Sequence, residues 1–99
     1  MPGVKYFHRT QVPPDAVMER AATFFGGRLA RSGDGPRRLE FAGSLGSITV
    51  TAGPEGGHYT LVTVATDQPG ESELDKLAKH FLGTVHVIAE PEHVLRGDY

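Results

Sequence analysis

Hydrophobic and polar residues alternate along five short segments of the chain, a pattern typical of strands that bury one face. These segments span residues 4–10, 28–32, 37–42, 47–52 and 58–66, and the first of them is rich in residues that favour strands. Clusters of Gly, Pro, Ser and Asp separate the last four segments, and such clusters form tight turns. Because short turns join antiparallel neighbours, we predict an antiparallel meander for the last four strands.

Two longer segments repeat their apolar residues with the period of an α-helix. Residues 12–27 contain Pro14, which suits a first turn, and Asp15, which favours the positive end of the helix dipole. Gly26 and Gly27 can take the left-handed conformation that ends many helices. This helix carries one apolar stripe, formed by Val17, Met18, Ala21, Ala22, Phe24 and Phe25.

The second helical segment is predicted to run from about residue 72 to residue 89. Ser72 and Asp75 have the spacing of a capping box. The apolar period continues through Gly83, which costs about 1 kcal/mol relative to alanine. The alternative is a helix that breaks at Gly83, with residues 84–90 forming a further strand.

The predicted element order is β-α-β-β-β-β-α. If the first helix returns the chain so that the second strand runs parallel to the first, the fifth strand runs antiparallel to the first and can pair with it. The expected fold is therefore an α+β two-layer sandwich, with a five-stranded antiparallel sheet of order 1-5-4-3-2 and both helices on one face. Residues 1–90 are expected to form this single domain, followed by a flexible tail at residues 91–99.

The fifth strand has apolar groups on both sides, so its register decides what the open face of the sheet exposes. If Pro54–Gly57 forms the preceding turn, Val62 and Val64 lie on the open face beside Phe7 and Thr49. A slip of one residue would reverse this assignment, because the side-chain period of a strand is two.

An open face of this composition predicts a partner. We expect a second copy of the chain to pack on it around a two-fold axis, with an interface that includes Phe7, Thr49, Val62 and Val64. Burial of three such apolar side chains would contribute roughly 1.5–3 kcal/mol each. The leading expectation is thus a non-catalytic interaction module that forms a homodimer.

Composition narrows the possible functions. The 99 residues suit one domain, and the formal net charge of −2 provides no field that would attract nucleic acid or an acidic membrane. The absence of cysteine excludes disulfides, thiolate metal sites and a cysteine nucleophile, and it fits a cytoplasmic location. No apolar run approaches the roughly 18 residues of a membrane span, and the first ten residues contain no signal core.

No pattern of chemical groups predicts a catalytic, metal or cofactor site. His80 and His86 would be separated by about 240° around a helix, so they could not readily share a metal ion. Glu90 and His93 have a metal-ligand spacing, but Pro91 lies between them and no second such motif exists. We interpret the glycine-rich segments 43–47 and 53–57 as hairpin turns. We interpret His8 and His58 as structural histidines, and Asp75, Lys76 and Lys79 as the solvent face of the second helix.

The element order, with the segment VPPDAVMERAATFF after the first strand and a long closing helix, resembles two known architectures. It is similar to the half-repeat of TATA-box-binding-protein-like folds and to a reduced helix-grip fold, as in START-like and birch-pollen-allergen-like proteins. The helix-grip resemblance implies an alternative function, namely binding of a small apolar ligand or a cyclase-like activity. Its pocket would lie between the long helix and the sheet, with Tyr6, His8 and Tyr59 as polar contacts.

Overall fold

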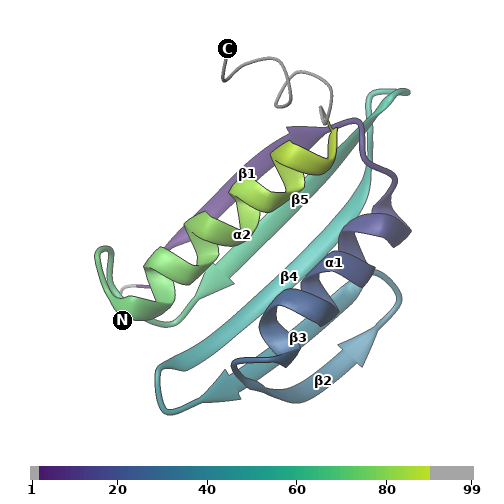
Figure 1. The fold of residues 1–99 in the computed structure, drawn as a ribbon. Helices are drawn as coiled ribbons and strands as arrows, with labels where there is room; N and C mark the ends of the chain where they lie inside the picture. Colours follow the sequence, from purple (N-terminus) through teal and green to yellow (C-terminus); the bar gives the residue numbers. More distant parts are fainter. Residues whose placement is uncertain (1–2, 90–99) are drawn as a thin grey trace.

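Seven elements form a two-layer sandwich in the computed structural model, which describes residues 3–89 of the chain. The sheet is antiparallel with the order β1-β5-β4-β3-β2, and both helices cover the same face (Figure 1). The predicted fold class and strand order are therefore confirmed, whereas the tail predicted at residues 91–99 lies outside the described residues. The elements are β1 (Lys5–Thr10), α1 (Pro14–Gly26), β2 (Ala30–Gly35), β3 (Arg38–Gly43), β4 (Gly46–Glu55), β5 (Tyr59–Thr66) and α2 (Glu73–Ala89).

Helix α1 packs mainly against β3 and β4. No side chain caps its first turn, which starts at Pro14, and its last turn ends at Gly26 as the sequence predicts. Val17, Ala21 and Phe25 are fully buried against the sheet. These residues recur at helical spacing, and they form the part of the apolar stripe that is fully covered by the sheet.

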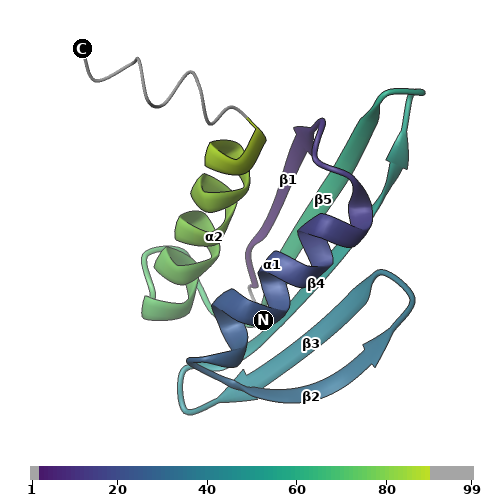
Figure 2. The ribbon, with the colours of Figure 1, turned by 45° about the vertical axis from the view of Figure 1, so that its right-hand side comes forward.

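Helix α2 lies over β1 and β5 and continues without a break through Gly83 (Figure 2). The alternative of a strand after Gly83 is therefore wrong. The Ser72 hydroxyl accepts the backbone N–H of Asp75 at 3.1 Å, which confirms the predicted cap. The buried face of α2 consists of Leu74, Asp75, Ala78, Phe81 and Val85.

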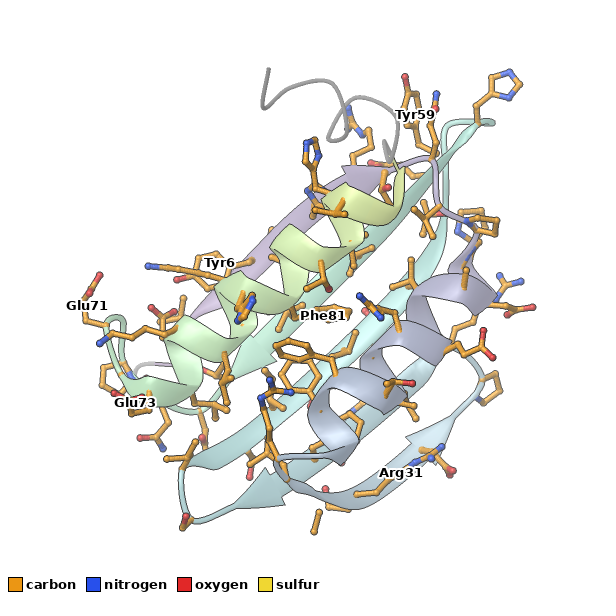
Figure 3. The ribbon with its side chains drawn as sticks, viewed as in Figure 1. Tyr6, Arg31, Tyr59, Glu71, Glu73 and Phe81 are labelled. Carbon is orange, nitrogen blue, oxygen red and sulfur yellow. The ribbon has the colours of Figure 1, made fainter. Side chains whose placement is uncertain are left out.

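Aromatic rings join the two helices to the sheet. The Phe81 ring lies between α1 and α2 (Figure 3), with its centroid 5.2 Å from that of Phe25 and 5.8 Å from that of Phe24. The Phe25 ring lies in turn 5.5 Å from the ring of Phe41 on β3. These contacts fill the space between the helices and fix the distance between them.

The register between β4 and β5 differs from the prediction. Val50 lies opposite Val64, and Ala52 lies opposite Val62, so both β5 valines point toward the helices and are 0% exposed. Strand β4 runs on to Glu55, which pairs with Tyr59, and only residues 56–58 form the turn. The placement of Val62 and Val64 on the open face was therefore wrong.

The error arose from Pro54, which suggested a turn but lies within β4. The N–H of Ala52 points toward β3, where the carbonyl of Arg37 accepts it at 3.2 Å. The nitrogen of Pro54, two residues on, faces the same side but lies beyond the last β3–β4 pair, Arg38 and Thr51. A proline there breaks no ladder hydrogen bond. Because β4 continues to Glu55, Ala52 pairs with Val62, three residues beyond the partner that a turn at Pro54 would give it. A shift by an odd number of residues moves every side chain of β5 to the other face of the sheet.

Strand β2 also differs from the strand predicted at residues 28–32, because it starts two residues later and ends three residues later. It covers Ala30–Gly35, with an irregularity in its pairing between Arg31 and Gly33, and the following turn places Arg37 at a positive φ of 59°. Glycine-rich residues that suggest a turn are thus part of an irregular edge strand. Neither helix of the described chain combines the length and the apolarity that crossing a bilayer requires.

Candidate functional site

The open face of the sheet carries two exposed aromatic residues, Phe7 of β1, whose surface is 64% exposed, and Tyr59 of β5, whose surface is 43% exposed. Phe7 lies opposite Thr63 of β5, which lies opposite Thr51 of β4. Leu61 lies diagonally beside Phe7 on the same face and is only half-buried. The β1–β5–β4 side of this face therefore carries a patch of apolar and threonine side chains that no helix covers.

Ion pairs border this patch. Arg9 contacts Glu55 at 3.1 Å across the β1–β5–β4 end of the sheet, and this partner raises the pKa of the Arg9 guanidinium. The Arg9 guanidinium also lies 5.9 Å from the centroid of the Tyr59 ring. On β3, Arg38 contacts Glu40 at 2.6 Å. An apolar centre with a polar rim is the usual anatomy of a protein interface.

Two of the four predicted interface residues belong to this open face. Phe7 is exposed there, and Thr49 is half-buried there beside Ala65. Val62 and Val64 are buried inside the domain and cannot contact a partner on that face. The sequence-based prediction missed Leu61 and Thr63, which take their places because of the register shift.

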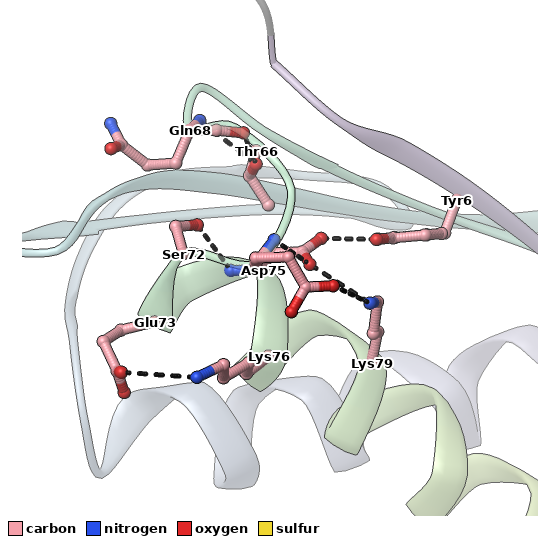
Figure 4. Close-up of polar contacts among 9 residues, drawn as sticks. Tyr6, Thr66, Gln68, Ser72, Glu73, Asp75, Lys76 and Lys79 are labelled. Atoms are coloured by element: carbon pink, nitrogen blue, oxygen red, sulfur yellow. Dashed lines mark hydrogen bonds and ion pairs between the residues drawn. The ribbon is translucent and has the colours of Figure 1, made fainter.

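A polar cluster joins β1 to α2 on the other face. The Tyr6 hydroxyl donates a hydrogen bond to the carboxylate of Asp75 (Figure 4). The same carboxylate accepts the backbone N–H of Glu71 at 2.9 Å and lies 3.3 Å from the ammonium of Lys79. The Asp75 side chain is 0% exposed, so its interpretation as a solvent-facing residue was wrong.

These contacts set the protonation of the cluster. The hydrogen bond from Tyr6 holds the pKa of Asp75 below its ordinary value, with help from the Glu71 N–H and from Lys79. The same hydrogen bond raises the pKa of Tyr6, and the carboxylate raises the pKa of Lys79. Both carboxylate oxygens of Asp75 thus already have partners. The cluster is well suited to lock α2 onto β1 and leaves no vacant position for a substrate.

The three aromatic residues expected to contact a ligand do not come together. Tyr6 and His8 lie on the covered face of β1, opposite Val64 and Val62. Tyr59 lies on the open face, beside Arg9, because of the same register shift. Burial lowers the pKa of His8, and the nearby His86 of α2 lowers it further.

The space between α2 and the sheet is filled by side chains. Val62, Val64 and Phe81 meet there, and each is 0% exposed. A shallow hollow of about 300 Å³ lies instead beside α1, with Met18, Ala22 and Leu39 as its apolar part. Its charged border consists of Asp15, Glu19, Arg31 and Arg37. This hollow is open to solvent and lies away from the predicted pocket.

Among residues 3–89, the His, Asp and Glu side chains nowhere gather in threes around a position that could hold a metal ion. Glu90 and His93 lie outside that range. The His80 ring packs edge-on against Phe24 at 5.4 Å, which gives it a structural role.

Comparison with known proteins identifies no relative: no family model, curated protein or solved structure matches the chain.

Proposed function

We propose that the protein is a small interaction module that forms a homodimer through the open face of its sheet. The observation that carries this proposal is the exposure of Phe7, 64% of whose surface faces solvent at the centre of a strand. An exposed aromatic ring within a patch of Leu61, Thr63 and Thr51 is costly to hydrate, and a second layer would remove it from water. Burial of the Phe7 ring would contribute roughly 1.5–3 kcal/mol.

The charges of the open face suit a second copy of the same chain. Arg9 is already paired with Glu55, and Arg38 with Glu40, within one copy. Lys5 on the same face forms no ion pair among the described residues, so the two-fold axis must hold the two Lys5 side chains apart for two such faces to approach without strong repulsion. Two sheets of this kind pack about 10 Å apart, with threonine and leucine side chains interdigitated.

The test is the oligomeric state of Phe7→Lys, measured by sedimentation velocity across the micromolar range. We expect the unmodified protein to be a dimer and Phe7→Lys to be a monomer, because the substitution replaces an apolar interface side chain with a cation in each copy. Val87→Lys is the matched control, since Val87 is 45% exposed on α2 and far from the open face. An unmodified protein that stays monomeric, or equal behaviour of the two variants, would refute the proposal.

The alternative proposal is a ligand-binding or cyclase-like function with a pocket between α2 and the sheet. The element order supports it, as does the position of Tyr6 and His8 beneath α2. The filled space around Phe81 and the position of Tyr59 on the opposite face count against such a pocket. The alternative proposal includes a relationship to the TATA-box-binding-protein-like or helix-grip families. Both proposals include a cytoplasmic location, which the cysteine-free sequence fits.

A further inference from the structure

The two edges of the sheet differ in how well they could accept another strand. Strand β2 forms one edge, where the pairing irregularity between Arg31 and Gly33 distorts the strand. Strand β1 forms the other edge, and its six residues pair with β5 in unbroken register. Distortion protects an edge from further pairing, whereas a regular edge invites it. The β1 edge is therefore the one that can be extended.

The outward backbone groups of β1 follow from its pairing with β5. The N–H of Thr66 donates to the carbonyl of Val4 at 2.9 Å, so these two residues form a hydrogen-bonded pair. Such pairs alternate along an antiparallel ladder. Residues 6, 8 and 10 therefore bond to β5, and the N–H and C=O groups of Lys5, Phe7 and Arg9 point away from the sheet.

The side chains of these same three residues lie together on the open face, with Phe7 between two cations. If β1 of a second copy paired antiparallel with Phe7 opposite Phe7, each Lys5 would lie opposite Arg9 of the other copy. Like charges directly opposite each other destabilise a strand pair. In this register the two Lys5–Arg9 pairs disfavour a second copy, whereas a strand that carries acidic residues at those two positions is attracted by Lys5 and by Arg9, whose present partner is the exposed Glu55 carboxylate.

We propose that the β1 edge binds an extended acidic peptide as a sixth, antiparallel strand. In this arrangement an apolar residue of the peptide lies opposite Phe7, and acidic residues two positions before and after it lie opposite Arg9 and Lys5. Backbone hydrogen bonds to Lys5, Phe7 and Arg9 hold the peptide, and the two cations select it by charge. The acidic residue of the peptide then binds the Arg9 guanidinium beside Glu55 or in its place.

This inference does not rest on the proposed dimer, because its backbone hydrogen bonds form at the edge of the sheet, although the side chains of Lys5, Phe7 and Arg9 that select the peptide lie on the open face. It is tested by amide hydrogen exchange, followed by NMR, with the synthetic probe Thr-Glu-Thr-Val-Thr-Glu-Thr. We expect the amides of Lys5, Phe7 and Arg9 to exchange rapidly in the free protein and slowly with the probe. The amides of Tyr6 and His8 should be protected in both states. A peptide with lysine in place of both glutamates is the matched control and should give no protection.

A pair of variants separates the backbone from the side chain. Arg9→Pro removes the outward N–H and leaves the ladder to β5 intact, because proline is tolerated where the N–H faces solvent. Arg9→Thr removes the same charge but keeps the N–H. We expect both variants to bind the glutamate peptide more weakly than the unmodified protein, and Arg9→Pro to bind up to about tenfold more weakly than Arg9→Thr.

Three results would overturn the inference. The first is equal binding of the glutamate and lysine peptides, and the second is equal affinity of Arg9→Pro and Arg9→Thr. The third is protection of the Lys5, Phe7 and Arg9 amides that grows with protein concentration in the absence of peptide. That result would show that a second copy occupies the edge.

Discussion

Val50 of β4 lies directly opposite Val64 of β5, and both side chains are fully buried beneath the helices. This pair fixes which residues of β5 face the interior and which face the open side. The pairing of β1 with β5 then places Phe7 opposite Thr63 and beside Leu61 on the open side, away from the two valines.

The register can be tested with lysine at two adjacent positions. Val64→Lys should prevent folding, because an ammonium group in the core has neither water nor a partner. Thr63→Lys should fold with a change of about 0.5 kcal/mol or less, since Thr63 lies on the open face. Val64→Ala, a milder change, should lower the free energy of unfolding by about 2 kcal/mol. Urea unfolding checks all three; a stable Val64→Lys protein would contradict the register.

The predictable part of this fold comes from local patterns. The helical period of α1 and α2 and the Ser72 cap are visible in the sequence, because each depends on residues a few positions apart. The β4–β5 register depends instead on Pro54, whose missing N–H matters only if a neighbouring strand is present. Strand β5 offers apolar residues on both sides, so its own alternation cannot choose between them.

The polar cluster was not predictable for a related reason. Tyr6 and Asp75 are 69 positions apart in the chain, and only the packing of α2 on β1 brings them together. The spacing of Ser72 and Asp75 indicated a cap, and the cap exists, but the Asp75 carboxylate bonds to Tyr6 and to the Glu71 N–H. Sequence spacing therefore identified a helix start and missed a buried carboxylate.

Gly83 provides a prediction about helix stability. Nothing lies within 4 Å of a Cβ atom added at this position, and the residue is exposed in the middle of α2. Gly83→Ala should therefore raise the free energy of unfolding by about 0.5–1 kcal/mol, because alanine loses less backbone entropy in a helix. Thermal or urea unfolding measures this change.

Gly46→Ala is the contrasting variant. Gly46 has a φ of 128°, and an added Cβ would lie 2.7 Å from the Asp67 carboxylate. We expect Gly46→Ala to lower the free energy of unfolding by about 1–3 kcal/mol from the strained backbone alone. Equal effects of the two substitutions would contradict the assigned conformations.

Asp75 should govern part of the acid sensitivity of the fold. Its pKa in the folded state is lowered from 3.8, so its ionised form stabilises the fold at neutral pH, and this contribution is lost as the pH falls through the folded-state pKa. Tyr6→Phe removes the hydrogen bond that lowers the pKa of Asp75 most, so the variant should lose less stability as the pH falls. Tyr59→Phe, on the open face, is the control and should leave the pH profile of unfolding unchanged.

His8 should titrate below its ordinary pKa of 6.5, because burial lowers its pKa first and His86 lowers it further. His86→Gln removes the second cause, so the pKa of His8 should rise but stay below that ordinary value. NMR titration of the ring protons follows this directly. His80→Gln is the control on the same helix; a shift of His8 in that variant and not in His86→Gln would contradict the arrangement.

The most direct test of self-association is an isotope-filtered NOE experiment on a mixture of labelled and unlabelled protein, which detects only contacts between copies. A dimer through the open face predicts intermolecular NOEs from the Phe7 ring to the methyl groups of Leu61, Thr63 or Thr49, and none to Val62 or Val64. If the Phe7 ring shows no intermolecular NOE at concentrations where NMR is practical, the open face is not a dimer interface.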